Sequence, residues 1–212
     1  MTSQSKEAFE AAVTLLSERD QVMAGIVTRH GVPEFWHRPP GFSTLVLFIL
    51  EQQVSLASAA AAFNKLASRL GKVTPVTILA ATDEELRSDG FSRQKSRYVR
   101  ELASSVLSGD IDLGELHSQE DDQVRGRLIS LIGIGPWTAD VYLLSCLRRP
   151  DVWPVHDRAL QVATSEALSL PEVPAPEQLR DIGEGWRPHR STAARLLWHS
   201  YLSRRGRTET AF

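Results

Sequence analysis

The chain has 212 residues, of which 42% are hydrophobic, enough to bury a substantial core in one domain or in two small lobes. Its formal net charge of −2 excludes a protein that coats nucleic acid non-specifically, so any DNA contact must come from local charge asymmetry. Its single cysteine, Cys146, excludes an intramolecular disulfide and a four-cysteine iron–sulfur cluster. No apolar run reaches the roughly 18 residues of a membrane span and no secretory signal pattern opens the chain, so we expect a cytoplasmic protein.

Hydrophobic positions recur with helical spacing along the whole chain, and convincing strand alternation is absent, which predicts an all-α protein. Stretches rich in glycine and proline separate the helical segments. The expected helices, in chain order, cover residues 5–30, 42–50, 55–70, 75–81, 83–88, 92–108, 113–116, 119–131, 136–147, 157–168, 176–182 and 189–204.

A glycine hairpin separates the expected helices 119–131 and 136–147. Gly133 and Gly135 permit positive φ and close backbone approach, and Pro136 suits the first turn of the helix that follows. The freed N–H groups and the positive end of the helix dipole would form a small anion site that fits one DNA phosphodiester. The expected DNA contacts on this hairpin are Gly133, Ile134, Gly135 and Thr138.

A carboxylate, Asp157, stands at the start of the expected helix 157–168. Aspartate is a favoured N-cap, so Asp157 could serve only as a cap, although capping and catalysis are compatible. Asp151 is the competing candidate for the catalytic acid, but it is expected to lie in a loop. Asp140, on the second hairpin helix, is expected to face outward or to cap.

Arginines gather in two stretches that contain no acidic residue. The first, residues 91–100, contains Arg93, Lys95, Arg97 and Arg100. The second contains Arg187, Arg190, Arg195, Arg204, Arg205 and Arg207. Each stretch alone could be an ordinary solvated helix face, whereas both beside one site would indicate DNA binding. Arg190 is the member that we expect to contact DNA.

The hairpin and the acid resemble those of the helix-hairpin-helix superfamily of DNA glycosylases, most closely its alkylpurine branch, the 3-methyladenine DNA glycosylase II type. Three further blocks in the same order carry the resemblance, which runs from about residue 42 to residue 198. They are FSTLVLFILEQQVS at 42–55, GFSRQKSRY at 90–98 and WRPHRSTAARLLW at 186–198.

The resemblance implies a fold of two helical lobes with an inter-lobe cleft. Residues 42–147 would form the central lobe with the hairpin, and residues 1–41 and 148–212 a second lobe that carries the catalytic acid. The branch's best-known member has an additional N-terminal β-rich domain, which we expect this chain to lack.

The resemblance also assigns roles to single residues. Asp157 lies 20 residues after Trp137, as the branch's catalytic aspartate does from its hairpin tryptophan. Trp137 and Trp198 align with pocket tryptophans, and Gln53 aligns with the wedge that fills the gap left by a flipped base, with Gln52 and Ser55 as neighbouring DNA contacts. Packing roles for the tryptophans and helix-end capping by the glutamines stay open. Three other aromatic residues are expected in the core: Tyr142, Trp153 and Trp186.

The function that follows is a monofunctional DNA glycosylase that releases alkylated purines from double-stranded DNA in base excision repair, acting as a monomer at the nucleoid. Bifunctional relatives such as endonuclease III carry a nucleophilic lysine where this chain has Trp137. His156 departs from the acidic residue common beside the catalytic aspartate. No metal or organic cofactor is expected, although the resemblance allows a monovalent cation at the hairpin carbonyls. A non-catalytic damage sensor and a glycosylase for another lesion are the alternatives.

Overall fold

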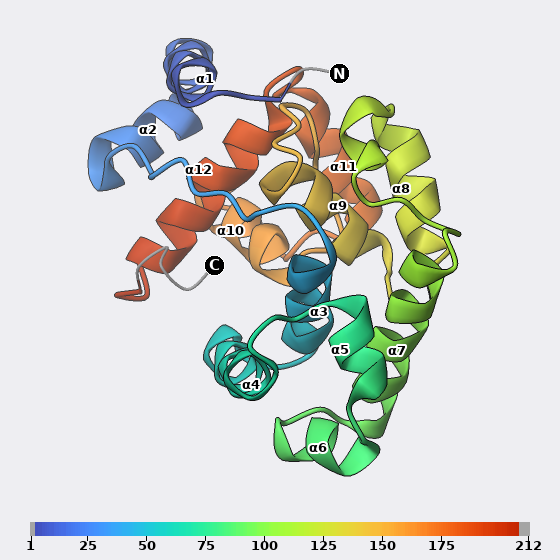
Figure 1. Ribbon diagram of the computed structural model, residues 1–212. Coiled ribbons are helices and arrows are strands. Elements are labelled where there is room, and N and C mark those ends of the chain that lie inside the picture. Colours follow the sequence, from blue (N-terminus) through green and yellow to red (C-terminus); the bar gives the residue numbers. More distant parts are fainter. Residues whose placement is uncertain (1–2, 208–212) are drawn as a thin grey trace. The chain divides into compact units, whose positions relative to one another are not determined.

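A computed structural model describes residues 3–207, which form twelve α-helices and one short 3-10 helix (Figure 1). Within these residues there is no strand, so the prediction of an all-α protein is confirmed. None of the described helices is both long and apolar enough to cross a membrane. The chain divides into two compact units: Arg38–Tyr142, and the described residues on either side of it, 3–37 and 143–207. Residues 1–2 and 208–212, parts of the expected second lobe, lie outside the described residues.

The unit Arg38–Tyr142 is arranged around α3, an almost wholly apolar helix. Leu45, Val46 and Ile49 on this helix are inaccessible to solvent, because α4 and α7 pack against it. The long helix α7 also packs against α5 and α6 (Figure 1). The helices of this unit are α3 (Phe42–Glu51), α4 (Leu56–Leu70), α5 (Pro75–Ala80), α6 (Asp83–Ser88), α7 (Arg93–Leu107), the 3-10 helix η1 (Glu115–Ser118), α8 (Asp121–Ile129) and most of α9 (Pro136–Ser145).

The other unit is built on α12 (Arg190–Ser203), which packs against α10 (Arg158–Leu168), α2 (Gln21–His30) and α1 (Lys6–Arg19). The remaining helix of the unit, α11 (Pro176–Glu184), packs against α10. Trp153 and Trp186 are buried with ring centroids 5.2 Å apart, which confirms their predicted packing role.

The single helix expected over residues 5–30 is two helices, because Asp20 interrupts it. The Asp20 carboxylate accepts hydrogen bonds from the N–H groups of Val22 at 2.8 Å and Met23 at 3.1 Å and so caps α2. The same carboxylate accepts a bond from the Trp186 indole at 2.8 Å. Helical periodicity continues through this point, so the hydrophobic pattern alone could not locate the break.

Arg195, which the sequence placed in a basic surface stretch, is instead one of the most deeply buried side chains, with 1% exposed. Its guanidinium donates to the carbonyls of Trp36 at 2.7 Å and Leu144 at 3.2 Å. It also lies over the Trp36 ring, 4.2 Å from the centroid, and the Phe35 ring, 5.0 Å from the centroid. Arg195 therefore organises the core of this unit.

The free energy of unfolding should depend on pH through His30, the last residue of α2, which packs against α12. Desolvation, helped by the nearby charges of His199, Arg204 and Arg29, lowers the pKa of His30. Below about pH 6.5 the unfolded chain therefore binds a proton that the folded chain resists, so stability falls as pH falls through this range. We expect the free energy of unfolding to fall less between pH 7.5 and pH 5.5 in His30→Phe than in the wild type, because the variant lacks this titrating group. An equal fall in the free energy of unfolding of both proteins would contradict the assignment.

Candidate functional site

The hairpin lies between α8 and α9. At its first glycine, Gly133, the backbone conformation and the neighbouring side chain leave no room for a Cβ. Gly133 has φ +88°, and a Cβ built on it would lie 2.2 Å from Cγ of Tyr98 on α7. The Ile134 N–H donates to the Leu131 carbonyl at 3.1 Å, and the Ile134 side chain is 4% exposed. Ile134 is thus engaged within the hairpin through both its side chain and its amide.

Gly135, unlike Gly133, does not use the positive φ that a glycine permits. Its φ lies outside the left-handed region, and a Cβ would meet no atom within 4 Å. Its N–H has no acceptor among residues 3–207, while its carbonyl accepts the Ala139 N–H that opens α9. The space beside Gly135 is therefore open to a molecule from outside, and the adjoining helix start carries a partial positive charge.

The loop after α3 is tied to the hairpin through Gln52. The Gln52 side-chain amide donates to the Gly133 carbonyl at 2.8 Å and to the Thr138 hydroxyl at 3.4 Å. Thr138 is 1% exposed, so its hydroxyl does not face solvent. The side chains of these two residues thus join two segments of the unit. Their expected contacts with DNA stay a prediction.

The tip of this loop faces outward. Gln53 is exposed and adopts a left-handed conformation with φ +58°, and the neighbouring Val54 is 46% exposed. Ser55 is also exposed, and it caps α4 by accepting the Ser58 N–H at 3.2 Å. An exposed amide beside an exposed apolar side chain can fill a gap between stacked bases.

Lys95 holds the loop from the other side, a contact that the sequence did not suggest. Its Nζ donates to the Leu50 carbonyl near the end of α3 at 2.7 Å, and burial lowers the pKa of its ammonium group. Glu51, the last residue of α3, is fixed by two bonds from the Arg38 guanidinium, at 2.8 and 3.1 Å. The base of the loop is thus anchored while its tip is left exposed.

We expect Lys95→Met to loosen this loop while leaving the packing of α7 intact, since methionine keeps most of the side-chain volume. Loss of the hydrogen bond, about 1 kcal/mol, should raise amide hydrogen exchange at Gln53 and Val54 about fivefold. Lys65→Met, which changes an exposed lysine of the same unit, is the matched control. Unchanged exchange in the Lys95 variant would mean that this contact does not hold the loop.

Asp157 stands at the start of α10 in the other unit, half-exposed. Its Oδ1 accepts the Leu160 N–H at 2.6 Å and the Trp198 indole N–H at 3.1 Å. Asp157 is thus an N-cap, as the alternative reading of the sequence held, and its carboxylate is also oriented by a buried tryptophan. Two donors on one carboxylate oxygen fix the direction of the Asp157 side chain.

Similarity to known proteins identifies the family of this chain. A family profile described as "HhH-GPD superfamily base excision DNA repair protein" matches residues 46–188. The chain belongs to this superfamily.

Individual HhH-GPD relatives extend the similarity. The chain is 28% identical to the putative DNA-3-methyladenine glycosylase YfjP of Bacillus subtilis over 75% of this chain and 58% of that protein. It is 25% identical to the alkylbase DNA glycosidase-like protein mag2 of Schizosaccharomyces pombe over 90% of this chain and 92% of that protein. The structure is similar to 3-methyladenine DNA glycosylase Mag1 of S. pombe in complex with abasic DNA, with TM-score 0.81, 27% identity and coverage of 89% and 95%. The chain thus spans somewhat over half of YfjP and nearly all of the two yeast relatives.

The predicted pocket tryptophans occupy different environments in this HhH-GPD protein. Trp137 is half-buried on the first turn of α9, with its ring centroid 6.5 Å from that of Phe48. Trp198 is 3% exposed, so what it presents to Asp157 is chiefly its indole N–H. Tyr142 is fully buried, and its hydroxyl accepts the Gly41 N–H at 2.9 Å, which confirms its predicted place in the core.

Sequence reasoning missed Trp36. This half-exposed ring lies 6.1 Å from the Trp198 ring, centroid to centroid, and is backed by the Arg195 guanidinium. Trp36 therefore offers an aromatic surface next to the tryptophan that orients Asp157. Only a cluster of aromatic residues before α3, Phe35 and Trp36, could have drawn attention to it.

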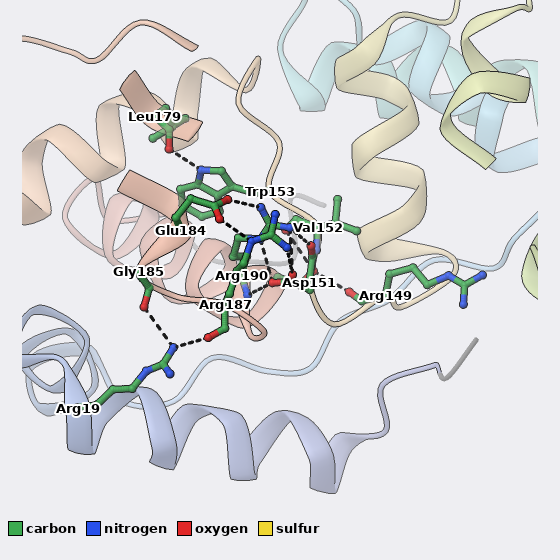
Figure 2. A network of polar contacts seen from close by, with 11 residues as sticks. Arg19, Arg149, Asp151, Val152, Trp153, Leu179, Glu184, Gly185, Arg187 and Arg190 are labelled. Carbon is green, nitrogen blue, oxygen red and sulfur yellow. Dashed lines mark hydrogen bonds and ion pairs between the residues drawn. The ribbon is translucent and has the colours of Figure 1, made fainter. Parts of the chain in front are cut away.

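Ion pairs within the fold engage three charged residues that the sequence analysis singled out: Arg190, Asp151 and Asp140. Arg190 binds Asp151 through Nε at 2.9 Å and Nη2 at 3.0 Å, and Glu184 through Nη1 at 3.2 Å (Figure 2). Asp151 also binds Arg187 at 2.9 Å, so this acid neutralises arginines. Asp140, expected to face outward or to cap, is 5% exposed and accepts the Arg125 Nε–H at 2.8 Å.

Other residues of the candidate site fall outside these contacts. His156 is exposed, next to Asp157 in sequence. Residues 3–207 hold no cluster of three histidine, cysteine or acidic side chains that could bind a metal ion.

Proposed function

We propose that this HhH-GPD protein is a monofunctional DNA glycosylase that hydrolyses the N-glycosidic bond of alkylated purines, such as 3-methyladenine and 7-methylguanine, in double-stranded DNA. The orientation of Asp157 by Trp198 supports this proposal most directly. The names of YfjP, mag2 and Mag1 favour alkylated bases as the substrate class. The protein would act as a monomer in the cytoplasm, at the nucleoid.

The proposed reaction uses one carboxylate. As the bond between C1′ and the base nitrogen breaks, the base leaves with the bonding electrons and the sugar gains oxocarbenium character. The ionised Asp157 stabilises this positive charge, and water attacks C1′ and gives up a proton, which the carboxylate accepts. An alkylated purine is cationic and therefore a good leaving group, so no strong acid is needed. The half-exposed Trp36 ring would suit a flat base, and the open space beside Gly135 would receive a backbone phosphate.

The lesion class is tested with a set of duplex oligonucleotides, each containing one modified base, scored for free-base release by chromatography. We expect release of 3-methyladenine and 7-methylguanine by the wild type. Release of only oxidised or mismatched bases would assign another lesion class. Binding to abasic DNA without any release would make the protein a damage sensor.

The absence of lyase activity is tested separately. The chain has four lysines, Lys6, Lys65, Lys72 and Lys95, and none of them lies in the hairpin, where bifunctional relatives carry the nucleophilic lysine. Lys95, whose pKa is lowered, has its Nζ hydrogen-bonded to Leu50. We therefore expect borohydride to trap no covalent complex with lesion-containing DNA, scored by denaturing gel. Efficient trapping would contradict a monofunctional mechanism.

A further inference from the structure

A second cluster of positive charge lies on the unit Arg38–Tyr142, away from the hairpin. Between α6 and α7 is a cavity of about 350 Å³ with the buried Phe91 in its wall. We call it the arginine groove. Its charged lining consists of Arg87, Arg93, Arg97, Arg100, Asp83 and Glu101. Arginines thus outnumber carboxylates by two, in a chain whose formal net charge is −2.

Three of these arginines form no ion pair with a carboxylate of the described residues, 3–207. Arg100 is held by the Ala81 carbonyl at 2.6 Å and by Asp83 at 3.0 Å. By contrast, exposed Arg87, Arg93 and Arg97 have no carboxylate partner within residues 3–207. Glu101 lines the groove but pairs with none of them.

The C-terminal arginines differ in this respect. Arg187 and Arg190 are bound to Asp151 and Glu184 (Figure 2), and Arg205 is bound to Glu166 at 2.6 Å. Of the two basic stretches in the sequence, the one on α7 therefore leaves more charge available to a ligand. This difference follows from tertiary contacts alone.

The groove is separate from the hairpin because α7 has two faces. Lys95 and Tyr98 point toward the α3 loop and the hairpin, as their contacts with Leu50 and Gly133 require. Arg93 and Arg97, one turn apart, share the other face with Arg100. A phosphate bound beside Gly135 would therefore not be the one that the groove holds.

We propose that the arginine groove binds backbone phosphates of DNA outside the lesion, an inference that rests on the proposed function insofar as DNA is the substrate. Guanidinium groups bind phosphate oxygens through paired N–H donors. Arg93 and Arg97 are separated by about 6 Å along the helix, so their two positive charges can reach different phosphates of one strand. A strand whose phosphates repeat about every 3.4 Å of helix axis can engage both arginines. A second patch of contacts would let a weakly acidic protein hold duplex DNA while it searches for damage.

The test is the salt dependence of binding to an undamaged 25-base-pair duplex. Each phosphate contact contributes about 0.9 to the slope of log affinity against log salt concentration, so Arg93→Gln with Arg97→Gln should reduce the slope by about 1.8. Lys65→Gln with Lys72→Gln, which removes the same charge from exposed lysines of the same unit, should leave the slope nearly unchanged. Melting temperatures of both double variants should match the wild type.

Two results would overturn the proposal. The first is an unchanged slope in the arginine variant. The second is a slope that falls equally in the lysine variant, which would show that only net charge matters. Titration with inorganic phosphate separates a free anion from DNA, because phosphate binding that is lost in the variant with no change of slope assigns the groove to a free anion.

Base release is measured on the same variants at saturating enzyme, where the single-turnover rate should be unchanged by the loss of Arg93 and Arg97. Failure of the wild type to release any base would refute the proposed function but leave the slope comparison valid. The two proposals can therefore fail independently.

Discussion

Asp157→Asn should reduce the single-turnover rate of 3-methyladenine release about a thousandfold, within the range expected when a charged catalytic group is removed. Asparagine keeps a side-chain oxygen that can accept the Leu160 N–H, so α10 should remain capped and the melting temperature nearly unchanged. The amide lacks the negative charge that stabilises the sugar cation and cannot take the proton of the attacking water. Release is measured by chromatography with enzyme in excess over a lesion-containing duplex.

Asp181→Asn is the matched control, because Asp181 is an exposed carboxylate on α11 of the same unit. Its release rate should stay within about twofold of the wild type, as is usual for surface changes. If Asp157→Asn also retained the wild-type rate, Asp157 would be a structural cap and another group would have to stabilise the sugar cation.

Trp198 should act through Asp157, which a double-mutant cycle can establish. Trp198→Phe keeps an aromatic ring in the core but removes the N–H that lies 3.1 Å from Oδ1. A hydrogen bond to a charged group is worth about 1.5–3 kcal/mol, so release should fall about tenfold or more. In the Asp157→Asn background the same change should have little further effect. Fully additive losses would indicate that Trp198 contributes to base binding directly.

Much of the local structure could be predicted because it depends on neighbours in sequence. Helical periodicity located the helices, and the main errors at their starts are capping residues such as Ser55, Ser92 and Asp157, which lie just outside them. The position of Asp157 at a helix start followed from the same local rules. Asp20 is the exception, because its capping bonds are local but the hydrophobic pattern runs past it.

Contacts between distant residues could not be predicted in the same way. Arg190 and Asp151 are 39 residues apart, and Arg195 and Trp36 are 159 apart. Composition can show that arginines are clustered, but only the fold shows which of them are neutralised. The same holds for Gln52 and Lys95, whose partners on the hairpin and on α3 give them supporting roles. A basic stretch in sequence therefore identifies a DNA-binding surface only after its internal ion pairs have been subtracted.

The two hairpin glycines should respond to alanine in opposite ways. At Gly133 the new Cβ would overlap the Tyr98 ring at 2.2 Å and the residue would have to keep φ +88°. Left-handed strain of about 1–2 kcal/mol and overpacking of about 1–3 kcal/mol should together lower the free energy of unfolding by about 2–5 kcal/mol, measured by urea denaturation. At Gly135 the Cβ meets nothing within 4 Å, so Gly135→Ala should change stability by less than about 0.5 kcal/mol.

Gly135→Ala should nevertheless weaken binding to duplex DNA at least tenfold, because its methyl group would occupy the space through which a phosphate approaches the hairpin amides. Binding is measured by fluorescence anisotropy at one fixed salt concentration. The control is Gly126→Ala on α8, because Gly126 is exposed, has no positive φ, and a Cβ there also meets no atom within 4 Å. A stable Gly135→Ala protein with wild-type affinity would mean that the open space beside this glycine is not where DNA lies. Since the folded chain itself places no atom near a Cβ at that position, loss of binding without loss of stability would identify the hairpin as a surface shaped for an external ligand.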